Sequence, residues 1–106
     1  MRMGIVLASR DPETAWNAFR FGVKAVEGGH TVRCFLLGAA VECEAIRGGP
    51  YDVAEQMRAF AERGGAVLAC GTCLRARQME GTELCPLSTM QDLVDLTVWA
   101  DRLLTF

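Results

Sequence analysis

The chain has 106 residues, of which 51% are hydrophobic and 23% charged, and its formal net charge is -2. This length fits one compact domain over residues 1–106 and leaves no room for a second one. Basic residues are not gathered in blocks, which argues against direct nucleic-acid binding, and no segment approaches a membrane span.

The first part of the chain predicts a strand, a helix and a second strand. Residues 3–9 are nearly all apolar, as in a central parallel strand. Asp11 offers an N-cap and Pro12 a first helical position, and the apolar stripe that follows ends at glycines 28–29. Residues 31–37 are the next predicted strand.

A less regular segment, residues 38–49, is expected to hold a short helix over residues 40–46. Asp52 and Glu55 then have capping-box spacing, and the helix that they begin should stop at glycines 64–65. The apolar run over residues 66–70 predicts the third strand.

The last part predicts a short helix over residues 72–79 and a weaker fourth strand over residues 82–87, in which Pro86 indicates a strand end or a sheet edge. Ser88 and Gln91 have capping-box spacing before another amphipathic helix. Residues 102–106 form a closing strand whose apolar end should be paired and buried. The whole pattern predicts a three-layer α/β/α sandwich around a five-stranded, mainly parallel sheet.

Five cysteines without a secretory signal are typical of reduced thiols in a cytoplasmic protein. Cys34 lies inside a predicted strand and Cys85 near another strand end, so both are interpreted as buried packing residues. Cys43 either packs under the loop after the second strand or faces Cys70 as a second thiol.

Cys70 is the strongest candidate for a reactive residue. It ends a buried strand at the sheet edge where ligands collect in open α/β folds, and a helix is predicted to begin directly after it. Helix N–H groups, with Arg75 and Arg77 if they fold back, would lower the pKa of a partly exposed thiol. Glu42 and Glu44 are interpreted as a solvated acidic loop beside this edge.

The spacing of Cys70 and Cys73 also fits a redox dithiol or half of a metal site. A second pair of ligands at a recognisable spacing is missing, and His30, the one histidine, is expected to be a turn residue. The sequence contains no phosphate-binding loop and no nucleophile elbow. No metal site and no cofactor are predicted.

Several segments resemble the DsrE/DsrF-like family, which includes TusD-type sulfur-relay subunits. The most specific is Ala-Cys-Gly-Thr-Cys-Leu-Arg-Ala-Arg over residues 69–77, similar to the family's reactive-cysteine segment. Supporting segments are Gly-His-Thr-Val followed by Phe-Leu-Leu-Gly over residues 29–38, Ser-Thr-Met-Gln-Asp-Leu-Val over residues 88–94, and the terminal residues 100–106. The resemblance covers nearly the whole chain.

The resemblance implies a sulfurtransferase-like persulfide carrier that assembles into homotrimers or hexamers and exchanges sulfur with donor and acceptor proteins. By position, Cys70 would accept the sulfur. Cys73 or Cys43 could act as a resolving thiol, and the remaining residues expected at the site are Gly71, Thr72, Arg75 and Arg77. Two alternatives stay open: a non-catalytic oligomeric module that binds a small ligand or metal, and a dithiol oxidoreductase.

Overall fold

The computed structural model describes all of residues 1–106 and places five strands in one sheet, in the order β4-β3-β2-β1-β5. Every neighbouring pair of strands is parallel. The strands are β1 (Arg2–Leu7), β2 (Thr31–Leu36), β3 (Ala66–Cys70), β4 (Leu87–Ser88) and β5 (Arg102–Thr105). The predicted parallel α/β architecture is therefore confirmed.

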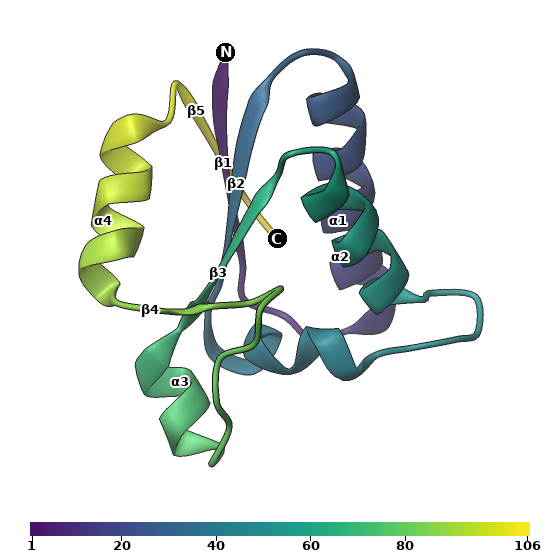
Figure 1. Cartoon of the computed structure of the whole chain (residues 1–106), viewed down its shortest axis with the longest axis vertical. Helices are drawn as coiled ribbons and strands as arrows, with labels where there is room; N and C mark the ends of the chain where they lie inside the picture. The colour runs from purple at the N-terminus through teal and green to yellow at the C-terminus, as the bar shows by residue number, and fades with distance from the viewer.

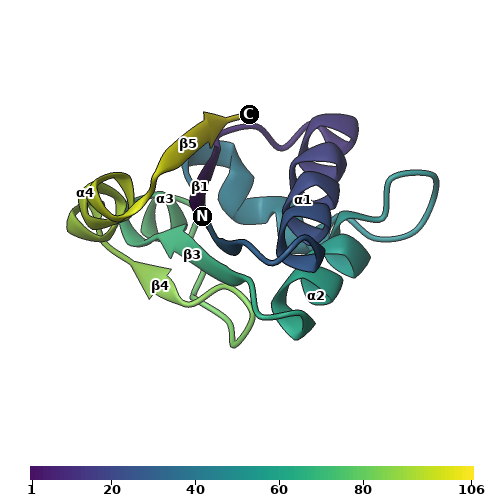
Figure 2. The ribbon, with the colours of Figure 1, turned by 90° about the horizontal axis from the view of Figure 1, so that it is seen from above.

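Helices cover both faces of this sheet. They are α1 (Pro12–Glu27), the 3-10 helix η1 (Gly38–Ala45), α2 (Val53–Glu62), α3 (Gly71–Ala76) and α4 (Met90–Trp99). Figures 1 and 2 show α1 and α2 side by side on one face, α4 alone on the other, and α3 beyond the carboxyl ends of the strands. Only α4 lies on its face because the chain crosses there once, from β4 at one edge to β5 at the other.

The largest buried side chains include two phenylalanines that lie between the sheet and the helix pair α1 and α2. Phe19 of α1 and Phe60 of α2 meet edge to face with ring centroids 5.8 Å apart, and both are fully buried. Gly22 and Gly65 allow this contact, because a Cβ at either would come within 3 Å of the Phe60 ring. The core therefore fixes α2 against β3, which is the strand that leads to Cys70.

Helices α1 and α2 begin at the residues that the sequence predicted as caps. The Asp11 carboxylate accepts a hydrogen bond from the Thr14 N–H at 3.0 Å, and the Asp52 carboxylate accepts one from the Glu55 N–H at 3.1 Å. These bonds satisfy N–H groups that a helix leaves unpaired in its first turn.

Three predictions about the last third are wrong in detail. β4 holds only Leu87–Ser88, because Pro86 has no N–H to extend the ladder toward residue 82. The capping box uses Thr89 with Asp92, one residue later than predicted, because Ser88 belongs to β4 and is buried. The terminal Phe106 is paired through its N–H to the Val6 carbonyl oxygen at 2.8 Å but is only half-buried, since β5 lies at an edge of the sheet.

The other boundaries differ by a few residues. The segment after β2 forms a 3-10 helix over Gly38–Ala45, where a helix over residues 40–46 was expected, and α3 spans Gly71–Ala76 instead of residues 72–79.

None of the helices is both long and apolar enough to cross a bilayer.

Candidate functional site

Cys70 is the last residue of β3 and the N-cap of α3, so the chain passes from strand to helix at this residue. Its neighbour Gly71 is required by close packing: a Cβ there would lie 2.9 Å from the backbone oxygen of Ser88. Strand β4 is consequently held tightly against the start of α3. Only 3% of Cys70 is exposed, so the expectation of a partly exposed cysteine is wrong for this conformation.

Cys73 lies one turn further along α3 and is half-buried. Its Sγ accepts a hydrogen bond from the backbone N–H of Gly38 at 3.2 Å. Gly38 has φ of +58°, a conformation that glycine adopts without strain. The loop after β2 therefore packs against the thiol pair through the backbone of a residue that sequence reasoning did not select.

The two thiols of this pair have pKa values shifted in opposite directions. Burial raises the pKa of Cys70, but the hydrogen bond offered by the Cys73 thiol, the N–H groups of Cys73 and Thr72, and the charge of Arg75 together lower it below its usual value. The Cys73 pKa is raised, first by that same hydrogen bond to Cys70 and then by burial. Cys70 is thus the thiol that ionises first.

Of the two arginines expected to lower the pKa of Cys70, Arg75 does so, whereas Arg77 pairs with Glu42 instead. Arg75 is exposed and acts on Cys70 through its charge. Arg77 donates through Nη1 to the Cys73 carbonyl oxygen at 3.2 Å and through Nε to the Glu42 carboxylate at 2.9 Å. Arg77 therefore binds α3 to the segment after β2.

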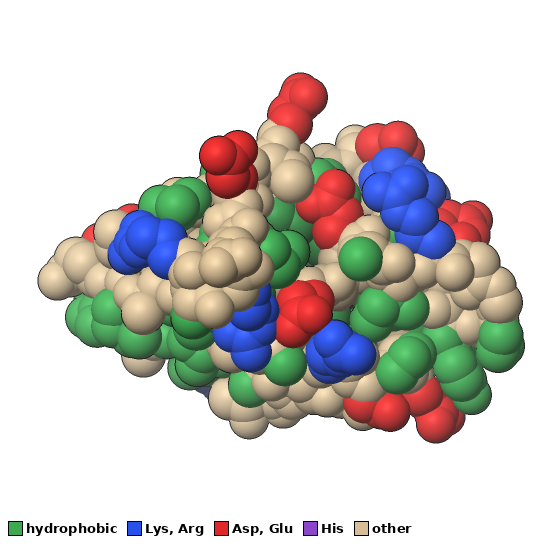
Figure 3. Space-filling view, turned by 90° about the horizontal axis from the view of Figure 1, so that it is seen from below, with side chains coloured by type: hydrophobic (Ala, Val, Ile, Leu, Met, Phe, Trp, Pro, Cys, Tyr) green, Lys and Arg blue, Asp and Glu red, His purple; other side chains and the backbone are tan.

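Glu42 is the centre of an ion-pair network that the sequence did not predict. Its carboxylate also binds Arg10 at 2.8 Å, so it joins the loops after β1 and β2 to the end of α3. Hydrogen bonding from Arg77 lowers the pKa of Glu42, and Arg10 adds to this effect although burial opposes it. Figure 3 views this end of the molecule and shows basic and acidic side chains next to one another across it.

The other three cysteines, Cys34, Cys43 and Cys85, are all buried inside the fold. Burial raises the pKa of Cys34 above the usual thiol range and, as the main cause, raises those of Cys43 and Cys85 to about 12. The Cys43 Sγ lies 3.6 Å from the Ser9 carbonyl oxygen, to which it donates. Of the two interpretations of Cys43, its environment matches packing under the loop.

The five cysteines thus have distinct environments. Cys70 is the one thiol whose pKa is lowered, whereas the pKa values of the other four are raised. The structure contains no group of three or more His, Cys, Asp or Glu side chains that could hold a metal ion.

The protein is a small α/β protein with a thiol site. Its parallel sheet has helices on both faces, and the cysteine with the lowered pKa lies at the carboxyl end of β3, where the chain passes into α3. The chain belongs to the DsrE/DsrF-like family, whose model matches residues 1–106.

Relatives of known sequence match most of the chain. The uncharacterised protein MJ0989 of Methanocaldococcus jannaschii is 32% identical over 100 residues, which cover 89% of this chain and 88% of that protein. The uncharacterised protein MK0008 of Methanopyrus kandleri is 33% identical over 103 residues, covering 89% and 83% respectively.

Two solved structures share the fold. The ychN protein from E. coli superposes with a TM-score of 0.84 and 23% identity, with 100% of both chains covered. A conserved protein of unknown function, BT1422 from Bacteroides thetaiotaomicron, gives 0.79 and 15% identity, with 99% of this chain and 94% of that one covered. Both likenesses concern the arrangement of strands and helices.

Proposed function

We propose that this protein carries sulfane sulfur in the cytoplasm as a persulfide on Cys70, receiving it from a donor protein and passing it to an acceptor protein. The observation that carries the proposal is the position of Cys70 where β3 passes into α3, beside the N–H groups of Thr72 and Cys73, which lower the pKa of its thiol. Membership of the DsrE/DsrF-like family supports the choice of sulfur as cargo.

The chemistry needs no net oxidation or reduction. The Cys70 thiolate attacks the outer sulfur of a donor persulfide, the donor's S–S bond breaks, and the donor leaves as a thiolate. Cys70 then holds the sulfur as a persulfide until an acceptor thiolate attacks that outer sulfur and releases the Cys70 thiolate. Because such exchange needs a thiolate at ambient pH, the lowered pKa of Cys70 favours the first step.

Cys73 offers a second outcome from the same persulfide. Its thiolate could attack Cys70 Sγ, which would form a Cys70–Cys73 disulfide and release the outer sulfur as hydrosulfide. The two protein thiols are oxidised in that step and the sulfane sulfur is reduced. The raised pKa of Cys73 is caused first by its hydrogen bond to Cys70 and so describes the protein before sulfur is loaded; we propose carriage as the main outcome and reductive release as the alternative.

Access limits the rate of the proposed reaction. With 3% of Cys70 exposed, a donor reaches the sulfur only after a local displacement of the covering residues. We therefore expect Cys70 to react more slowly than a small free thiol of the same pKa, because exchange depends on access as well as on the thiolate fraction.

We also propose that the chain forms homo-oligomers through the outer side of α4. Met90, Val94 and Val98 follow one another at helical spacing on that side and are 56%, 49% and 81% exposed. Leu93 and Leu96 face the sheet, so α4 carries apolar side chains on two sides, and an exposed apolar row of this kind is typical of a helix that packs against a partner. In Figure 3 apolar side chains gather along the α4 side of the molecule, on the left.

The carrier proposal is tested by incubating the protein with a small persulfide donor and measuring intact mass. Wild-type protein should gain one sulfur atom and lose it again when an acceptor thiol is added. Cys70→Ser should gain none, whereas Cys34→Ser, which removes a buried thiol of raised pKa, should behave as wild type. Equal loading of Cys70→Ser and wild type would refute the assignment.

A further inference from the structure

The first residue of η1 offers its backbone N–H to the thiol pair. Gly38 N lies 3.2 Å from Cys73 Sγ and donates to it. The N–H groups in the first turn of a helix have no partner within that helix, so they can bind a side chain instead. Cys73 in turn donates to Cys70. The three groups therefore form a chain of hydrogen bonds that runs from the backbone of η1 through Cys73 to Cys70.

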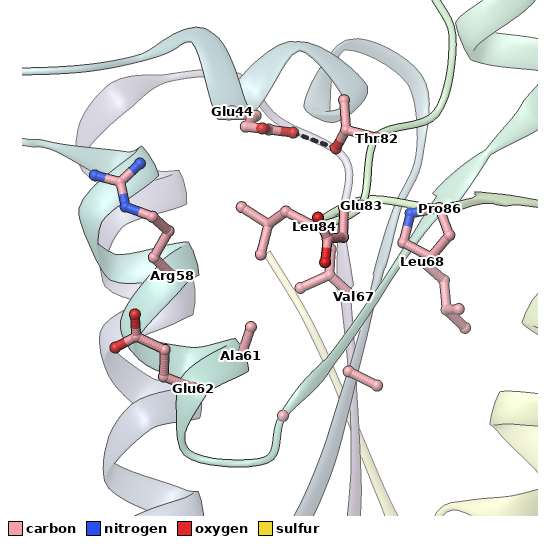
Figure 4. Close-up of a pocket in the computed structure, with 12 residues that line it drawn as sticks. Glu44, Arg58, Ala61, Glu62, Val67, Leu68, Thr82, Glu83, Leu84 and Pro86 are labelled. Carbon is pink, nitrogen blue, oxygen red and sulfur yellow. Dashed lines mark hydrogen bonds between the residues drawn. The ribbon is translucent and has the colours of Figure 1, made fainter.

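Several bonds hold η1 in place around this N–H. Immediately before it, the Leu37 N–H donates to the last carbonyl oxygen of β1 at 2.9 Å. Near the other end of η1, the Glu44 carboxylate accepts a hydrogen bond from the Thr82 hydroxyl at 2.6 Å, which Figure 4 shows beside α2 and β3. Between these two points, Glu42 forms ion pairs with two arginines. The donor is thus preorganised, and it need not move when the charge on Cys73 changes.

The backbone conformation at position 38 is one that glycine suits. Its φ of +58° lies in the left-handed region, where a Cβ normally costs energy. A Cβ added there would meet only the Ala8 carbonyl oxygen, at 3.9 Å, which is ordinary contact. Substitutions of Gly38 therefore act through backbone conformation and not through a steric clash. Asparagine, which tolerates the left-handed region, is the conservative replacement.

Few groups control the charge on Cys73. Before any sulfur is bound, its pKa is raised first by the hydrogen bond to Cys70 and then by burial, while the Gly38 N–H and the charge of Arg77 lower it. Glu42 pairs with that arginine. Once Cys70 Sγ is bonded to another sulfur, it is no longer a thiolate that accepts the hydrogen bond from Cys73. The Gly38 N–H and Arg77 then remain as the groups that favour a Cys73 thiolate.

We propose that the Gly38 N–H stabilises the Cys73 thiolate whenever Cys70 is bonded to another sulfur, and so promotes displacement of that sulfur by Cys73. Cys70 and Cys73 lie three residues apart at the start of one helix, where side chains face one another. In the step, Cys73 Sγ attacks Cys70 Sγ, a bond forms between the two cysteines, and the bond from Cys70 to the outer sulfur breaks. The electron pair of the broken bond leaves with the outer sulfur, as a thiolate or as hydrosulfide. The cysteine pair is oxidised and the leaving sulfur is reduced.

Gly38 is then the residue that shifts the balance from carriage toward release. For a sulfane sulfur this inference rests on the proposed carrier function, whereas for an organic disulfide it does not. The test can therefore use a disulfide reagent and remain independent of sulfur transfer.

The reagent is dipyridyl disulfide. At acidic pH, Cys70 takes up one pyridylthio group and releases one thiopyridone. After a jump to higher pH, Cys73 displaces the second thiopyridone, whose absorbance follows that step alone, and intact mass verifies the Cys70–Cys73 disulfide. The rate of the second release is measured over a range of pH for wild type and for variants at position 38.

Gly38→Pro has no N–H and should release the second thiopyridone more slowly at neutral pH. The lost hydrogen bond lowers the thiolate fraction roughly tenfold, and the greater nucleophilicity of the more basic thiolate offsets about threefold of this, so the net rate should fall about three- to fourfold. The pH midpoint of the second release should rise by roughly one unit, which a general distortion of the loop would not produce. If the proline variant does not fold, Gly38→Val gives the same test, because a β-branched residue disfavours the left-handed region.

Two variants serve as controls. Gly38→Asn keeps the N–H and the left-handed conformation and should behave as wild type. Gly48→Val places the same kind of strain at a φ of +75°, in the loop before α2 that projects from the molecule in Figure 1, and should also behave as wild type.

Equal second-release rates and equal pH midpoints in Gly38→Pro and wild type would overturn the inference. Equal slowing of the first and second releases would do so as well, and so would the absence of a second release from wild type. A parallel experiment with a persulfide donor measures the hydrosulfide released per sulfur loaded, which should fall in Gly38→Pro. If wild type loads no sulfur, the carrier function fails, while the result with dipyridyl disulfide still decides the role of Gly38.

Discussion

Replacing Cys73 with alanine should slow the alkylation of Cys70 at neutral pH, because it removes the thiol that donates a hydrogen bond to Cys70. A hydrogen bond to a charged group contributes on the order of 1.5 kcal/mol, which corresponds to roughly a tenfold change in the thiolate fraction. A thiolate of higher pKa is intrinsically more nucleophilic, and this offsets about a factor of three. The net expectation is a rate about three- to fourfold below wild type.

The assay follows iodoacetamide modification of Cys70 by peptide mass spectrometry over a range of pH. Cys73→Ser is the matched control, because a serine hydroxyl can still donate to Cys70 and accept from the Gly38 N–H. It should keep most of the wild-type rate. At alkaline pH, where Cys70 is fully ionised in both, the order should reverse, and the alanine variant should react about threefold faster because its thiolate is the more nucleophilic. Equal rates at neutral pH, or faster modification of Cys73 than of Cys70 in wild type, would refute the reasoning.

Three further predictions concern stability and assembly. Thr89→Ala should lower the free energy of unfolding by about 1 kcal/mol in urea titrations, because it removes a helix cap, whereas Gln91→Ala should have little effect. Gly65→Ala should cost about 1–3 kcal/mol in the same assay, since its Cβ would lie 2.4 Å from the Phe60 ring; unchanged stability would contradict that packing. Val98→Lys should shift light-scattering mass toward the monomer, and an unchanged mass would exclude α4 as the interface.

Lowering the pH provides a separate test of the ion-pair network around Glu42. The pKa of this carboxyl is lowered in the folded protein, chiefly by its hydrogen bond from Arg77. Its contribution to stability is therefore present above the usual glutamate pKa and is lost as the pH falls through the lowered folded value. Glu42→Gln should flatten that part of the stability profile relative to wild type, and identical profiles would show that the network contributes nothing.

Local patterns were sufficient where the structure depends on neighbouring residues. The run over residues 66–70 is apolar and bounded by glycines, and β3 has these limits. Asp11 and Asp52 were identified as caps because each acts within its own first turn. By contrast, Ser88 and Thr89 are adjacent hydroxyl residues, and only the pairing of Ser88 with Cys70 in the sheet decides which of them caps α4.

The candidate site was predictable in its position but not in its surroundings. The strand-to-helix junction at Cys70 follows from nearby residues, whereas its burial depends on β4, which packs against Gly71. Arg10 and Arg77 lie 32 and 35 residues from Glu42 in the sequence, so their ion pairs with it could not be inferred from spacing. Nothing in the composition distinguishes such a bridge from a solvated acidic loop.

The most direct test of the proposed role is to find where a donated sulfur resides. Wild-type protein is treated with a persulfide donor, the persulfide is blocked with an alkylating reagent, and the digested peptides are analysed by mass spectrometry. We expect the extra sulfur on the peptide that carries Cys70, attached to that residue. Sulfur found only on Cys73 or on one of the buried cysteines, with Cys70 unmodified, would contradict the assignment of Cys70 as the carrier.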